Sequence, residues 1–102
     1  MPGPARLIWL PEALADIQRL RQFIQPHNPT AARRAAQRIK AAAKRLQEYP
    51  VSGRLVKGLS EVRDLLIPFG SGNYVLRYRL VGPLVIIVHV WHSREDRSED
   101  QS

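Results

Sequence analysis

The chain has 102 residues, no cysteine and a formal net charge of +7, and 44% of its residues are hydrophobic. These values indicate one compact domain and exclude a disulfide scaffold, a cysteine-ligated metal site and a cysteine nucleophile. No apolar run approaches the ~20 residues that span a bilayer. We therefore expect a cytoplasmic protein that has no membrane segment and needs no cofactor.

The charge is distributed unevenly along the chain. Residues 1–94 carry a net charge of +10, whereas residues 95–102 carry −3. This pattern predicts a single domain over residues 1–94 and an acidic, flexible tail over residues 95–102. The basic body suits an anionic partner, either a nucleic acid or an acidic protein segment.

The first half of the chain is predicted to be mostly helical. Residues 7–10 form a short apolar run typical of a strand. Apolar side chains then recur at helical spacing over residues 12–25, which indicates an amphipathic helix. Asn28 is a good N-cap and Pro29 suits the first helical position, so a second helix is expected over residues 29–49.

The second helix is expected to have two different surfaces. Its apolar residues, most of them alanine, fall on one arc of roughly 120°. Small side chains allow close packing against the first helix, so we expect an antiparallel helical hairpin. The remaining surface is cationic and consists of Arg33, Arg34, Gln37, Arg38, Lys40, Lys44 and Arg45.

The second half of the chain reads as strands. Residues 54–60 are expected to be a loop. Three strand-like runs follow at residues 62–67, 73–80 and 84–91, and the short connections between them predict an antiparallel meander. The order β-α-α-β-β-β predicts an α+β domain in which a helical hairpin packs on an antiparallel sheet.

Several side chains allow both a structural and a functional interpretation. His92 is expected on the same strand face as Val90 and Ile86, either as a partly buried structural residue or as a catalytic one. His89 and His92 should face opposite ways, so we expect no shared metal. Tyr74 and Tyr78 are expected to be core or edge-packing aromatics, and Trp9 and Trp91 to be buried.

Five short motifs in this order resemble the RelE/ParE superfamily of toxins from bacterial toxin–antitoxin pairs. They are Trp-Leu-Pro-Glu-Ala-Leu-Ala-Asp-Ile at 9–17, Asn-Pro-Thr-Ala-Ala at 28–32, Tyr-Pro-Val-Ser-Gly-Arg at 49–54, Val-Arg at 62–63 followed by Tyr-Val-Leu-Arg-Tyr-Arg at 74–79, and Val-Trp-His-Ser-Arg at 90–94. The inter-helix turn, the Gly-Arg close and the His-x-Arg ending look more similar to the ParE branch than to the RelE branch.

The two branches imply different functions. A ParE-like chain is expected to inhibit DNA gyrase as an interaction protein, with no catalytic residues. A RelE-like chain would instead be a ribosome-dependent mRNA interferase, that is, an endoribonuclease. Its catalytic candidates here would be Arg63, His92 and Arg94, while other positions that are basic in RelE-like enzymes read Leu65 and Leu66. The resemblance therefore favours gyrase inhibition, with mRNA cleavage as the alternative.

The resemblance also implies a partner. A cognate ParD-like antitoxin is expected to neutralise the toxin in a hetero-oligomer, with helix and strand segments along the groove between the helices and the sheet. The expected contacts with target or antitoxin are Arg63, Arg77, Arg79, His92 and Arg94, followed by Arg33, Arg38 and Lys44. Ribosome and mRNA are partners only under the alternative.

Overall fold

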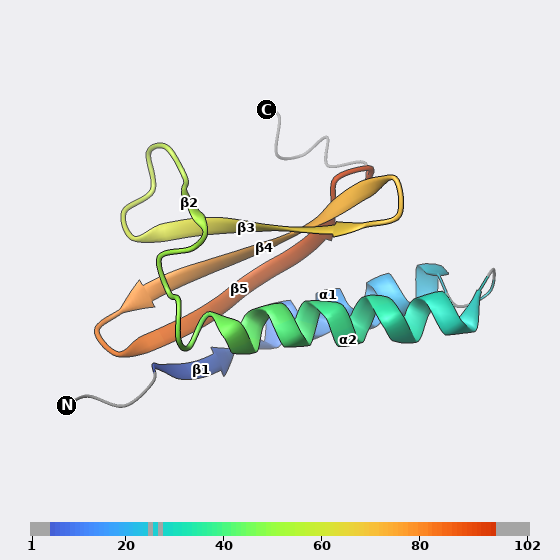
Figure 1. Cartoon of the computed structure of the whole chain (residues 1–102), viewed down its shortest axis with the longest axis horizontal. Helices are drawn as coiled ribbons and strands as arrows, with labels where there is room; N and C mark the ends of the chain where they lie inside the picture. Colours follow the sequence, from blue (N-terminus) through green and yellow to red (C-terminus); the bar gives the residue numbers. More distant parts are fainter. Residues whose placement is uncertain (1–4, 25, 27, 96–102) are drawn as a thin grey trace.

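The computed structural model describes residues 5–24, 26 and 28–95, and its elements occur in the expected order (Figure 1). They are β1 (Arg6–Trp9), α1 (Pro11–Ile24), α2 (Pro29–Arg45), β2 (Arg54–Leu55), β3 (Val62–Phe69), β4 (Gly72–Val81) and β5 (Leu84–His92). Two helices pack on a five-stranded sheet, which confirms the predicted α+β fold class. Of the expected acidic tail, only Glu95 lies within the described residues.

The sheet differs from the expected one in two details. Its strand order is β1-β5-β4-β3-β2, and β1 runs parallel to β5, so the sheet is mixed. No tight turn joins β1 to β5, and therefore no turn fixes their relative direction. The second difference is β2, which lies in the expected loop and pairs with Arg63 and Asp64 of β3.

Helix α2 begins where the sequence predicts and ends earlier. The side chain of Asn28 accepts a hydrogen bond from the Ala31 backbone N–H at 3.0 Å, as an N-cap does. The helix ends at Arg45 rather than near residue 49. Residues 46–48 continue as a tighter turn, in which each backbone N–H donates to the carbonyl three residues earlier.

The hydrophobic core lies between the two helices and one face of the sheet, which we call the inner face. Ala35, Ala36 and Ala43 of α2 are buried there with Ile39 and Leu46, as the apolar arc predicts. Tyr74 and Tyr78 are 1% and 0% exposed, which confirms them as core residues. Among the described residues, no helix is long and apolar enough to cross a membrane.

A bulge in β5 changes which residues face the core. Arg77 pairs with His89 whereas Tyr78 pairs with Ile87, so β5 has one extra residue at this point. Ile87 faces the helices before the bulge, and Val90 and His92 face them after it. The expectation that His92 shares a face with Ile86 is therefore wrong.

The two tryptophans are also less buried than expected. Trp9 is half-buried against the core. Trp91 is half-buried on the opposite face of the sheet, which we call the open face because no described helix covers it. The guanidinium of Arg77 lies 5.0 Å from the centre of its ring.

Side chains of α1 complete the edge of β5 beyond the end of β1. Asp16 accepts a hydrogen bond from the Val90 backbone N–H at 2.8 Å, and Arg19 donates to the Val90 carbonyl at 3.1 Å. Glu95 forms an ion pair with Arg19 and accepts from the His92 backbone N–H. These contacts satisfy backbone groups that would otherwise be available to another strand.

Candidate functional site

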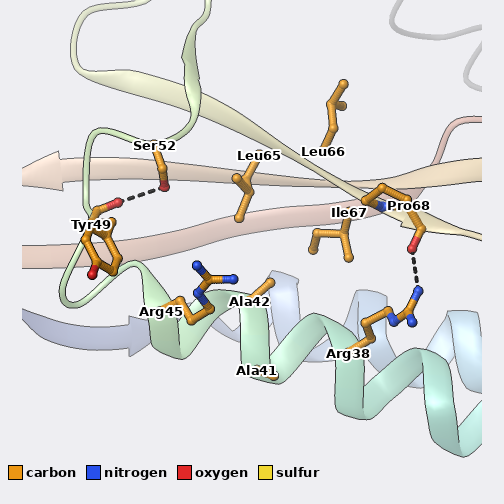
Figure 2. A pocket seen from close by; sticks show the side chains of 10 residues that line it. All are labelled: Arg38, Ala41, Ala42, Arg45, Tyr49, Ser52, Leu65, Leu66, Ile67 and Pro68. Atoms are coloured by element: carbon orange, nitrogen blue, oxygen red, sulfur yellow. Dashed lines mark hydrogen bonds between the residues drawn. The ribbon is translucent and has the colours of Figure 1, made fainter.

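A groove lies between α2 and the edge of β3 (Figure 2). Its volume is about 580 Å³. Apolar side chains dominate it, with Ala41 and Ala42 on one side and Leu65, Ile67 and Pro68 on the other. The groove is thus an apolar channel between a helix and a strand, which suits a protein segment better than a small polar ligand.

Two arginines of α2 border this groove. Arg38 donates a hydrogen bond to the Pro68 carbonyl at 2.8 Å, and its guanidinium lies 5.7 Å from the centre of the Phe69 ring. Arg45 also lines the groove and has no ion pair with any other described residue. Arg33 and Lys44, expected to act with Arg38, do not line the groove; helical geometry places them on the other flank of α2.

The edge of β3 along this groove is only partly available for strand pairing. Strand β2 pairs with Arg63 and Asp64, so no described strand pairs with the rest of this edge. Pro68 has no backbone N–H, and Arg38 already occupies its carbonyl. The groove therefore accommodates a helical segment more readily than a long added strand.

Arg63 has structural partners in this protein. Its guanidinium donates to the Gly53 carbonyl at 2.7 Å and to the Val51 carbonyl at 3.2 Å. The hydroxyl of Tyr78 binds the same loop, because it donates to the Pro50 carbonyl at 2.7 Å and accepts from the Gly53 N–H at 2.8 Å. Burial raises the pKa of Tyr78 above 10.0, against the lowering effect of the Gly53 hydrogen bond and the charge of Arg63.

His92 is the last residue of β5, and a turn follows it. Its Nδ1 accepts a hydrogen bond from the Arg94 backbone N–H at 3.1 Å, so the proton of the neutral ring is on Nε2. The ring packs edge-on against Tyr74, with ring centres 4.9 Å apart. Burial, and next the charge of Glu95, raise the pKa of Tyr74. Neither His92 Nδ1 nor Tyr74 is available here as a general base.

The three nuclease candidates do not converge. His92 and Arg94 lie together at the C-terminal end of β5, but Arg63 pairs with Tyr78 whereas His92 pairs with Tyr74 on the other side of β4. Four residues along β4 and two strand spacings separate their backbones by about 16 Å. The Arg63 guanidinium also points to the 50–54 loop. Arg63 therefore does not lie beside His92 and Arg94 in this structure.

Arg77 and Arg79 occupy the open face, opposite Arg63 and His92. Asp64 binds Arg77 through two hydrogen bonds of 2.8 and 3.0 Å. Arg79 is exposed and forms no ion pair with any other described residue. The structure thus divides the expected contact residues between the two faces of the sheet.

Sequence reasoning missed several residues that the structure brings into this account. Arg45 and Tyr49 line the groove. A signal was present for Arg45, because it lies two helical turns after Arg38 on the same flank of α2. Asp16 and His89 form a hydrogen bond of 3.0 Å across a separation of 73 residues, and no local pattern indicates that contact. Within the described part of the chain, no group of three or more His, Cys, Asp or Glu side chains could hold a metal ion.

Comparisons with known proteins point to one family. The family model described as the ParE toxin of type II toxin–antitoxin system, parDE, matches residues 7–97. Toxin RelE2 of Caulobacter vibrioides is 39% identical over 89 residues, which cover 87% of this chain and 96% of that protein. Toxin RelE1 of the same organism is 39% identical over 85 residues, which cover 83% of this chain and 89% of that protein.

Solved structures of such systems have the same fold. A chain of the chromosomal ParDE system from P. aeruginosa superposes with a TM-score of 0.73 at 23% identity, covering 86% of this chain and 95% of that one. A chain of the intact E. coli RelBE toxin–antitoxin complex superposes with a TM-score of 0.58 at 15% identity, covering 89% of this chain and 99% of that one. From the family match, the close relatives and the fold together, this chain belongs to the ParE/RelE family of toxins of type II toxin–antitoxin systems.

Proposed function

We propose that this chain is a gyrase-directed toxin that acts by binding and not by cleaving RNA. The observation that carries the proposal is the separation of Arg63 from His92 and Arg94. Arg63 is engaged by the 50–54 loop, and Nδ1 of His92 is engaged by a backbone N–H. Arg63 thus lies apart from the other two candidates, and both Arg63 and Nδ1 of His92 already have partners within the fold.

The neutralising partner in this proposal is a cognate ParD-like antitoxin. An amphipathic segment of the antitoxin would lie in the groove between α2 and β3, with apolar side chains against Ala41, Ala42 and Leu65 and carboxylates near Arg38 and Arg45. The basic character of the whole chain would speed association with an acidic segment. This supports a hetero-oligomeric complex in which the toxin is inactive.

A ribosome-dependent mRNA interferase is the second candidate, and the names of relatives favour it. The two Caulobacter vibrioides proteins that are 39% identical to this chain are named RelE1 and RelE2. Under this candidate, His92 and Arg94 would act without Arg63, because of the three only these two lie side by side.

A supercoiling assay with DNA gyrase and the purified chain, with and without antitoxin, tests the proposal. We expect the chain to inhibit supercoiling and the antitoxin to relieve this inhibition. The same preparation is added to translating ribosomes, and transcripts are mapped by primer extension. Folded chain that binds antitoxin, leaves gyrase active and cuts ribosome-bound mRNA would overturn the proposal and establish the second candidate.

A further inference from the structure

The edge of β5 that faces away from β4 is only partly covered by β1. Strand β1 pairs with β5 as far as Ile87, and no other described strand pairs with this edge. The Ser93 backbone N–H donates to the Asn73 carbonyl of β4. Because backbone groups alternate in direction along a strand, those of Val90 and His92 point away from β4, towards the uncovered edge. Edge groups of this kind can pair with a strand of another chain.

Each of these four backbone groups has a partner that is not a strand. Asp16 Oδ2 accepts from the Val90 N–H at 2.8 Å, and Arg19 donates to the Val90 carbonyl at 3.1 Å. Glu95 Oε1 accepts from the His92 N–H at 2.9 Å, and the Glu95 backbone N–H donates to the His92 carbonyl at 3.0 Å. In order along the edge, the partners are acceptor, donor, acceptor and donor, which is the alternation that a neighbouring strand would present. We call Asp16, Arg19 and Glu95 the edge cap.

Arg19 joins the edge cap into one unit. Its guanidinium forms ion pairs with Glu95 and, at 3.2 Å, with Asp16. The Asp16 and Glu95 side chains are 16% and 23% exposed, so both carboxylates lie against the edge and are not free in solvent. Asp16 and Arg19 belong to α1, whereas Glu95 lies in the turn after β5. The edge cap therefore forms only when the helix, the strand and the C-terminal turn are all in place.

We propose that the edge cap prevents two copies of this chain from pairing through β5. Antiparallel, two-fold pairing would place residues 90–92 of two copies side by side, because each offers N–H and C=O groups in the same alternation. With the edge cap in place, an incoming strand would have to displace two carboxylates and a guanidinium from their backbone partners. The inference concerns the free chain and does not depend on gyrase inhibition or on the antitoxin.

Asp16→Ala with Arg19→Ala tests the proposal on the full chain, because it removes two of the three members of the edge cap. Sedimentation equilibrium measures association over a range of concentrations. We expect the unaltered chain to remain monomeric and the variant to form dimers as its concentration rises. Amide hydrogen exchange supplies a second readout. The Val90 N–H should exchange about tenfold faster in the dilute variant, the effect of losing one hydrogen bond to a charged group, and should become protected again in the dimer.

The matched control is Glu12→Ala with Arg21→Ala, which also removes one acid and one base from α1, at exposed positions. It should stay monomeric, and equal association of both double variants would overturn the proposal. So would a folded variant without Asp16 and Arg19 that stays monomeric, or one that dimerises while the Val90 N–H still exchanges rapidly. Thermal unfolding shows whether each variant is folded. If the variant without Asp16 and Arg19 is not, Glu95→Ala leaves α1 intact, and the His92 N–H replaces the Val90 N–H as the probe.

Discussion

At the scale of single residues, Gly53 shows how a short motif has a structural cause. A Cβ built on Gly53 would lie 2.6 Å from the Tyr78 hydroxyl oxygen and 2.7 Å from its ring. The absence of a side chain lets the Tyr78 hydroxyl bind both Pro50 and Gly53. Arg63 then donates to the Gly53 carbonyl. Gly53, the glycine of the motif at 49–54, therefore holds the loop after α2 in place together with Tyr78. Arg63 has a structural role in this loop.

Gly53→Ala should lower the free energy of unfolding by about 1–3 kcal/mol, because the added methyl group forces the Tyr78 ring or the loop to move. Denaturant unfolding followed by circular dichroism measures the change. Ser60→Ala is the control at an exposed position and should change stability by less than about 0.5 kcal/mol. A Gly53→Ala variant as stable as the control would contradict the close packing of Gly53 on Tyr78.

At the scale of elements, the two flanks of α2 differ in what they face. Arg38 and Arg45 border the groove, whereas Arg33 and Lys44 do not. All four are cations on one helix that carries no acidic residue, so charge alone does not distinguish them. Their positions around the helix axis do distinguish them. Arg38 and Arg45 are seven residues apart, so they lie nearly two helical turns apart on the same flank.

Charge reversal on each flank should separate these roles in antitoxin binding. Arg38→Glu with Arg45→Glu is expected to weaken binding by about tenfold or more, equivalent to about 1.4 kcal/mol. Arg33→Glu with Lys44→Glu makes the same change in net charge and should have a much smaller effect. Surface plasmon resonance at fixed salt measures both.

Arg38 also binds the Pro68 carbonyl, so the single variant Arg45→Glu serves as a check that does not disturb that contact. Equal losses from both double variants would mean that the antitoxin responds to net charge and not to the groove.

At the scale of the whole molecule, the sheet separates two surfaces. The inner face carries the helices and borders the groove, and the open face carries a hollow lined in part by Arg79 and His89. A segment bound in the groove would therefore leave the hollow uncovered. Tyr74 and Tyr78 lie on the inner face with their pKa values raised mainly by burial, so their protonation is coupled to folding of the entire core.

Stability should consequently fall as the pH rises above about 10, the ordinary pKa of a tyrosine. In that range the unfolded chain loses phenolic protons that the folded chain retains, so the folded state binds more protons and raising the pH favours unfolding. The decline continues until the raised pKa values are reached. Urea unfolding on both sides of pH 10 measures the slope, and Tyr74→Phe should make it shallower. An unchanged slope in Tyr74→Phe would exclude Tyr74 as a source of the decline.

Local patterns in the sequence were sufficient for much of the fold. Asn28 and Pro29 predict the start of α2 because a cap involves only residues close in the chain. The alanine arc of α2 predicts its buried side, since burial of a helix follows its 3.6-residue period. The alternation of Tyr74, Leu76 and Tyr78 likewise predicts the buried face of β4. The family followed from motifs of the same kind.

The site depended on contacts between residues far apart in the chain, and these only the tertiary structure decided. Nothing near Asp16 indicates that it meets His89, and the bulge that turns His92 toward the core depends on how β5 registers with β4. The sequence leaves Arg63 as a catalytic candidate, whereas in the structure its guanidinium binds the 50–54 loop. The sequence by itself thus determined most of the elements, the buried sides of α2 and β4, and the family, because these depend on local periodicity and capping. Strand register and packing determined which charged groups are free, because they bring distant side chains together.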